Sequence, residues 1–88
     1  METVADAIGN ASLAILEAQA AVDAVVLAEP DSRRVAAWLT IARLNLRRAE
    51  RARKEVWRNL ALEDVRVHTD SVKHLIALRS VEARREVT

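Results

Sequence analysis

Apolar residues recur along the first third of the chain at alternating spacings of three and four, which is the period of one face of an α-helix. This stripe consists of Val4, Ile8, Ala11, Ile15, Ala18, Val22 and Val25. Thr3 and Asp6 have the spacing of a capping box, in which their side chains satisfy the first free backbone N–H groups. Pro30 disfavours helical backbone at the residue before it. The pattern therefore predicts a helix over residues 3–28 and a turn over residues 29–32.

A second stripe of the same period follows the turn. It consists of Val35, Leu39, Ala42, Leu46, Ala49, Val56 and Leu60, with Trp38 and Trp57 on its flanks. This stripe predicts a helix over residues 32–62, which Asp31 or Ser32 can cap. Two apolar stripes joined by a short turn predict a long antiparallel helical hairpin with a coiled-coil-like seam.

A run of β-branched residues followed by typical N-cap residues interrupts the pattern after the second stripe. We therefore expect a break over residues 64–70 and a shorter third helix over residues 70–86. The alternative is one helix that continues through residue 85, although the apolar stripe loses register after Leu60. Either arrangement predicts an all-α fold, a small helical bundle that forms a single domain over residues 1–88.

The composition agrees with this fold and excludes several alternatives. Gly9 and Pro30 are the only glycine and proline, whereas β-rich and α/β folds need many turn residues. The absence of cysteine excludes a disulfide framework, thiol catalysis and a Cys-ligated metal. The sequence contains no basic leader. It also contains no uncharged run as long as the about 18 residues that span a membrane. We therefore expect a cytoplasmic protein without a membrane partner. Abundant arginine, alanine and valine are typical of GC-rich bacterial or phage genomes.

Gly9 interrupts an otherwise alanine-rich helix. A glycine within a helix lowers its stability by about 1 kcal/mol relative to alanine. We expect Gly9 to mark the close approach of a neighbouring backbone, and the alternative is a helix that begins near Asn10.

The sequence carries no pattern typical of catalysis. His68 and His74 are six residues apart, so they do not share a helix face. Two acid–histidine pairs are four residues apart, Asp64 with His68 and Asp70 with His74. Pairs at this spacing are more often surface contacts than metal sites. Neither a glycine-rich phosphate loop nor a nucleophile elbow occurs. We expect no enzyme, no cofactor, no metal and no small-molecule substrate.

The first helix carries a second apolar face, which consists of Leu13, Leu16, Ala20 and Leu27. A shorter third helix covers only part of this face, so the remainder needs another partner. We expect these residues, with Trp38 and Trp57, to form a protein interface with a second copy or with a larger partner. The predicted function is a non-enzymatic interaction or assembly module, either a structural component or a small inhibitor.

Charge is divided unevenly along the chain. Residues 1–32 contain six acids and no Lys or Arg, whereas residues 33–88 contain all fourteen bases and seven acids. One row of cations beside the second stripe consists of Arg43, Arg47, Arg51, Lys54 and Arg58. This row predicts nucleic-acid binding as the alternative function, or else a solvated face that pairs with acids of the first helix. The absence of Phe and Tyr and the net charge of +1 argue against nucleic acid.

Arg53 falls within the second apolar stripe, where an unpaired guanidinium is costly to bury. Pairing the hairpin about its turn places Arg53 opposite Asp6. We therefore predict an Arg53–Asp6 contact that fixes the register of the two helices. The competing expectation is that Arg53 extends to solvent at the edge of the stripe.

Overall fold

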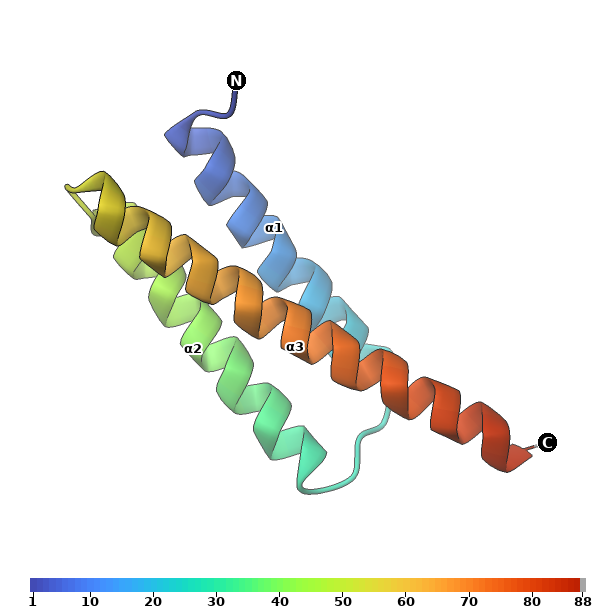
Figure 1. The fold of residues 1–88 in the computed structure, drawn as a ribbon. Coiled ribbons are helices and arrows are strands. Elements are labelled where there is room, and N and C mark those ends of the chain that lie inside the picture. Colours follow the sequence, from blue (N-terminus) through green and yellow to red (C-terminus); the bar gives the residue numbers. More distant parts are fainter. Residues whose placement is uncertain (88) are drawn as a thin grey trace.

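The computed structural model describes residues 1–87 as three α-helices connected by short loops (Figure 1). α1 spans Val4–Asp23, α2 spans Asp31–Arg51 and α3 spans Glu55–Val87. No strand occurs in this part of the chain. The chain reverses direction at each loop, so α2 runs antiparallel to α1 and to α3. The predicted all-α bundle is therefore confirmed.

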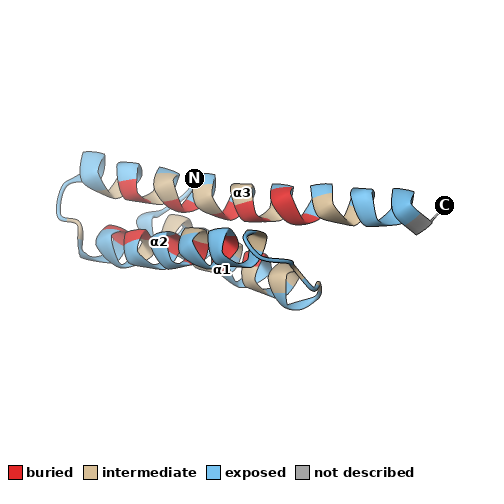
Figure 2. Ribbon diagram, turned by 90° about the horizontal axis from the view of Figure 1, so that it is seen from below, coloured by how far each residue is buried: buried red, intermediate tan, exposed pale blue. Residues whose placement is uncertain are grey.

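α3 packs against both other helices and holds the bundle together. Figure 2 shows buried residues along the side of α3 that faces the layer formed by α1 and α2. The interface between α2 and α3 is the largest of the three, and that between α1 and α2 is the smallest. The C-terminal turns of α3 extend beyond the other helices (Figure 2). The first two helices therefore depend on α3 for most of their packing.

α1 begins as its capping residues predict but ends earlier than expected. Thr3 Oγ1 accepts the backbone N–H of Asp6 at 3.1 Å, and Asp6 Oδ2 accepts the backbone N–H of Thr3 at 3.1 Å, so the capping box is confirmed. The helix ends at Asp23 rather than near residue 28. Leu27 lies outside the helix and packs against the core. In an unbroken helix this side chain would lie on the same side as the exposed Leu16, away from the core.

We expected a break after the second apolar stripe, at residues 64–70. The structure has the break within the stripe instead, at residues 52–54. α2 ends at Arg51 rather than near residue 62, and Ala52 adopts extended backbone with φ −67° and ψ 130°. Both the predicted second helix and the alternative of one helix through the C-terminal half are therefore wrong. The turn folds the last part of the second stripe back onto α2 as the start of α3.

Residues 64–70 lie in the middle of α3, which has 33 residues and is the longest helix rather than a shorter one over residues 70–86. Val65 is fully buried, and the buried Thr69 hydroxyl donates to the Val65 carbonyl at 2.9 Å. Although Val67 is 45% exposed, the other β-branched residues that predict a break, Val65 and Thr69, are thus core residues. Their packing outweighs helix propensities that differ from that of alanine by at most about 0.7 kcal/mol per residue.

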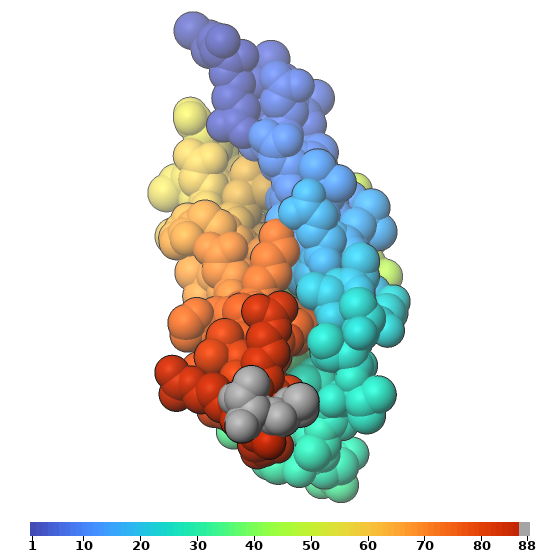
Figure 3. Space-filling model, turned by 90° about the vertical axis from the view of Figure 1, so that its right-hand side faces the viewer, coloured from blue at the N-terminus to red at the C-terminus, as the bar shows by residue number. Residues whose placement is uncertain are grey.

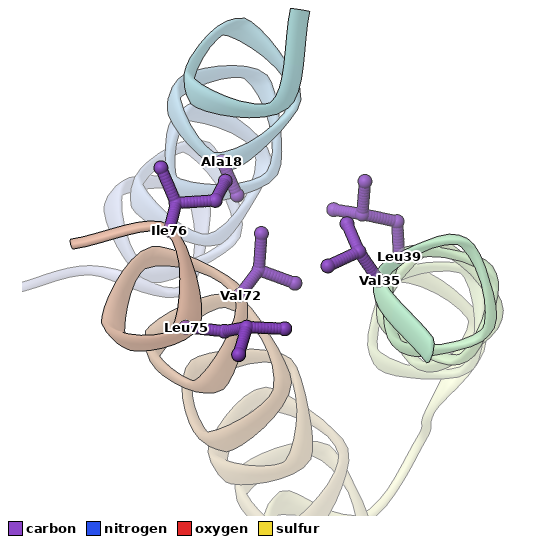
Figure 4. Close-up of a cluster of buried hydrophobic side chains, with 6 residues drawn as sticks. All are labelled: Ala18, Val35, Leu39, Val72, Leu75 and Ile76. Carbon is purple, nitrogen blue, oxygen red and sulfur yellow. The ribbon is translucent and has the colours of Figure 1, made fainter. Parts of the chain in front are cut away.

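Two clusters of buried side chains form the core. In the larger one, side chains of α3 face those of α2, with a small side chain of α1 beside them (Figure 4); its members are Ala18, Val35, Leu39, Val72, Leu75 and Ile76. The smaller cluster joins Ile15, Ala42 and Val65. Four of the eleven buried hydrophobic residues are alanines, so the core is thin even for a short chain.

Ion pairs connect α3 to both other helices. Arg79 Nε donates to Asp31 Oδ2 at 2.6 Å at the start of α2, and Lys73 Nζ donates to Glu17 Oε2 at 3.0 Å on α1. The hydrogen bond from Arg79 lowers the pKa of Asp31 below its usual value. Glu17 of the acidic first helix is thus paired with α3 and not with the basic face of α2.

Candidate functional site

α1 exposes an apolar row on the side that faces away from the other helices. Its members are spaced by four, three and four residues and therefore share one side of the helix; they are Gly9, Leu13, Leu16 and Ala20. Leu13 is 52% and Leu16 is 64% exposed, whereas Ile15 and Ala18 on the other side are buried. We call this row the α1 outer face. Neither α2 nor α3 covers it.

Gly9 lies at the N-terminal end of the α1 outer face. A Cβ atom built on Gly9 would meet no atom within 4 Å apart from its chain neighbours and the nearby backbone of its own helix. No neighbouring backbone approaches it within the described residues, and the helix begins at Val4 rather than near Asn10. Both expectations for Gly9 are therefore wrong for the isolated chain. The glycine leaves a low, open region beside Leu13 on the surface.

The other predicted interface residues do not join the α1 outer face. Leu27 and Trp38 are partly buried and pack against the larger core cluster, so they are core residues at its margin. Trp57 is 59% exposed and lies in the first turn of α3. The structure thus keeps Leu13, Leu16 and Ala20 together and places Trp57 on a separate surface.

A hollow of about 500 Å³ lies between the C-terminal end of α2 and the first turns of α3. Trp57 and Leu60, the latter 56% exposed, form its apolar side. Arg48 and Arg51 supply cations from α2, and the remaining lining residues are Asn45, Ala52, Ala61 and Asp64. We call this hollow the α2–α3 groove. Sequence reasoning missed it because the pattern placed Trp57 and Arg48 on one continuous helix.

The predicted row of cations does not lie on one helix. Arg43, Arg47 and Arg51 project from α2, but Lys54 lies in the turn and Arg58 lies on α3. Arg43 Nη2 donates to Gln19 Oε1 of α1 at 2.6 Å, and Arg58 Nη2 donates to the carbonyl oxygen of Ala52 in the turn at 3.1 Å.

The cations instead gather at the end of the bundle where α2 meets α3. Twelve consecutive residues contain six cations and two acids, and the cations are Arg47, Arg48, Arg51, Arg53, Lys54 and Arg58. Within residues 1–87, none of these six cations forms an ion pair. The chain therefore carries an uncompensated positive surface at this end, beside the α2–α3 groove.

The predicted Arg53–Asp6 contact is wrong. Arg53 lies exposed in the turn after α2, and Asp6 caps the N-terminus of α1 through Thr3. The contact depended on a second helix that runs through Arg53, and that helix ends at Arg51. The competing expectation that Arg53 reaches solvent agrees with its exposure.

The two acid–histidine pairs differ in the structure. His68 Nδ1 lies 2.6 Å from Asp64 Oδ1 and 2.8 Å from the Asp64 carbonyl oxygen. Asp70 accepts from Arg66 Nη1 at 3.0 Å instead of pairing with His74. In the part of the chain that the structure describes, no three His, Cys, Asp or Glu side chains gather closely enough to hold a metal ion.

A second hollow of about 360 Å³ lies between the N-terminal half of α1 and α3. Figure 3 shows these two helices packed side by side. Arg66 at its edge pairs with Glu63 and with Asp70, and the hydrogen bond from Arg66 lowers the pKa of Glu63. Three of the four charged residues that line this hollow, Glu2, Glu63 and Asp70, are acids, so it lacks the excess of cations found beside the α2–α3 groove.

Comparison of the chain with protein-family models, with curated proteins and with solved structures finds no match. Over the described residues, none of the helices has both the length and the apolar character needed to cross a bilayer.

Proposed function

We propose that the chain is a non-enzymatic protein–protein association module that binds its partner through the α1 outer face. The observation that carries this proposal is the exposure of Leu13 and Leu16 on one side of a helix whose other side forms the core. Single exposed leucines are ordinary, but a continuous row on a helix that is apolar on both sides is typical of an interface. Full burial of a wholly exposed leucine side chain is favourable by roughly 1.5–3 kcal/mol, and Leu13 and Leu16, which are already partly covered, gain only part of that on association.

The thin core supports the same proposal. An 88-residue chain leaves a larger share of its apolar surface in water than a longer chain does. Here the buried set is small, while Leu13, Leu16, Trp57 and Leu60 are each more than half exposed. Association removes such side chains from water and adds to the stability of the fold. The proposal covers two roles that need such an exposed apolar surface: a cytoplasmic component of a bacterial or phage assembly, and a small inhibitor of another protein.

A paired substitution tests the role of the α1 outer face. The variant Leu13→Asp/Leu16→Asp places two carboxylates on the face without disturbing a buried residue. We expect it to lose association, measured as molar mass by light scattering, and to keep the helix content of the wild type by circular dichroism.

Leu78→Asp is the matched control, because Leu78 is an exposed leucine of α3 that lies outside both surfaces. The control is expected to associate like the wild type. The proposal is wrong if the double variant forms the same complexes as the wild type at equal concentration.

The uncompensated cations favour nucleic-acid binding as a second candidate function. Phosphate contacts release counterions, so the logarithm of affinity falls with the logarithm of salt concentration by about 0.9 per contact on duplex DNA. We expect the slope for Arg47→Ala/Arg48→Ala/Arg51→Ala to be smaller than that of the wild type by about 3, measured by fluorescence anisotropy. Arg33→Ala/Arg34→Ala, at the other end of α2, is the control. An unchanged slope for the triple variant contradicts this candidate.

A further inference from the structure

The α1 outer face has a distinct charge pattern. Its apolar centre lies between Asp6 and Asp23, whereas Glu17 on its flank is already paired with Lys73 of α3. α1 contains no Lys or Arg, so every charged side chain along the helix is negative. A surface that covers this face therefore needs an apolar centre and cations beside it, because carboxylates buried against an apolar surface without partners are costly.

The α2–α3 groove has the complementary pattern. Trp57 and Leu60 supply exposed apolar area, and Arg48 and Arg51 stand beside it without ion-pair partners in the described chain. The one carboxylate that lines the groove, Asp64, is already paired with His68. The groove thus presents apolar side chains and available cations at the same place. This combination fits an acidic helix with a leucine row.

The two surfaces lie on different sides of the molecule. Arg43 donates to Gln19 and therefore marks the side of α2 that faces α1. Arg48 follows five residues later, which is a rotation of about 140° around the helix. The groove therefore opens away from the α1 of its own chain. An α1 outer face that enters this groove must come from another molecule.

We infer that the partner of the α1 outer face is the α2–α3 groove of a second copy of this chain, an inference that rests on the proposed function. Each copy then offers one α1 outer face and accepts another in its groove. Such a contact either closes reciprocally in a symmetric dimer, in which each α1 outer face fills the groove of the other copy, or continues head to tail into a chain or a larger ring.

The size and charge of this contact determine its strength. One helix seated on a groove lies near the low end of specific interfaces, about 1,200 Å² of buried surface or less, so assembly should depend on protein concentration. Opposite charges on the two surfaces strengthen the contact at low salt and are screened at high salt. We therefore expect assemblies that grow with concentration and shrink as salt is added.

Mixing two defective variants tests the inference. Leu13→Asp/Leu16→Asp removes the α1 outer face but keeps the groove, whereas Trp57→Asp/Leu60→Asp removes the groove but keeps the face. Each variant alone is expected to be monomeric, with the 9.8 kDa mass of one chain. An equimolar mixture has one intact contact and is expected to give a species of twice that mass. Light scattering behind size exclusion measures all three samples.

A second groove variant guards against loss of folding. Arg48→Glu/Arg51→Glu changes only exposed charges and leaves the apolar residues in place. We expect this variant to assemble more weakly than the wild type. Added salt, which lowers the molar mass of the wild-type assemblies, should not lower that of the variant. Circular dichroism checks that each variant keeps its helices.

The outcomes separate this inference from the proposed function. The inference is overturned if the wild type is monomeric at every concentration, if both groove variants assemble like the wild type, or if the mixture stays monomeric. In those cases the proposed function stands as long as the α1 outer face variant loses another protein partner. If the wild type assembles and the α1 outer face variant assembles to the same extent, the proposed function fails as well.

Discussion

Gly9 stands on an exposed helix face where a larger residue has room. Its backbone does not use a positive φ, and no atom beyond the nearby backbone of its own helix lies within 4 Å of the position that a Cβ would occupy. The conformational freedom of glycine therefore serves no purpose within the isolated chain and only lowers the stability of α1. The residue makes physical sense if a partner surface approaches α1 closely at this point.

Gly9→Ala should therefore stabilise the protein. The added methyl group meets open space, and alanine restricts the unfolded chain more than glycine does, so the gain is up to about 1 kcal/mol. Chemical denaturation followed by circular dichroism measures the change. A destabilised variant would show that the backbone at Gly9 is strained or in contact with another part of the protein.

The ion pair between Asp31 and Arg79 should make stability depend on acid pH. The hydrogen bond from Arg79 holds the folded pKa of Asp31 below its usual value of 3.8. The contribution of Asp31 is therefore complete above that usual value and is lost as pH falls through the lower folded pKa.

Asp31→Asn should destabilise the protein at neutral pH and lose less stability than the wild type between neutral pH and about pH 3. Denaturation midpoints at the two pH values measure this difference. Asp23→Asn, which changes an exposed carboxylate at the end of α1, is the control. If Asp31→Asn and the wild type lose the same stability between neutral pH and about pH 3, the ion pair between Asp31 and Arg79 does not have this role.

At the scale of whole elements, the sequence predicts the starts of α1 and α2 better than their ends. The start of α1 depends on Thr3 and Asp6, a signal that is local. The end of α2 has no such signal, because residues 52–54 contain neither Gly nor Pro. Val56 and Leu60 also continue the apolar stripe of α2 in register, so the period alone favours one long helix. Only the packing of α3 against α2 decides that the chain turns there.

The same distinction applies to the two candidate surfaces. The α1 outer face follows from helical period, because Leu13 and Leu16 fall opposite the core stripe in any helix that contains them. The α2–α3 groove follows from a tertiary turn that brings Trp57 beside Arg48. Local pattern predicts the first surface and contains no information on the second.

The continuity of α3 predicts unequal effects for two neighbouring valines. Val65 is fully buried, whereas Val67 is 45% exposed on the opposite side of the helix. Val65→Ala should lower the free energy of unfolding by about 2 kcal/mol, through lost burial and the cavity that remains. Val67→Ala removes the same atoms and should change it by less than about 0.5 kcal/mol. Denaturation with urea measures both, and similar effects would mean that residues 64–70 do not pack as one helix.

At the scale of the whole molecule, charge separation accompanies the separation of surfaces. All the charged residues of α1 are acids, and the cations concentrate where α2 meets α3. The net charge of the chain is nevertheless only +1. A molecule of this kind has weak overall repulsion between copies and strong local attraction between unlike ends. Head-to-tail association uses this pattern directly, and the apolar rows supply the burial that charges alone do not.

The molar mass of the wild type and of Leu13→Asp/Leu16→Asp, measured by light scattering over a range of concentrations at low and high salt, tests the central claim most directly. The account predicts that the wild-type mass exceeds 9.8 kDa, rises with concentration and falls with salt, whereas the variant stays at 9.8 kDa throughout. Identical masses for the two proteins under every condition, with no partner protein lost by the variant, would contradict the claim that the α1 outer face is the binding surface.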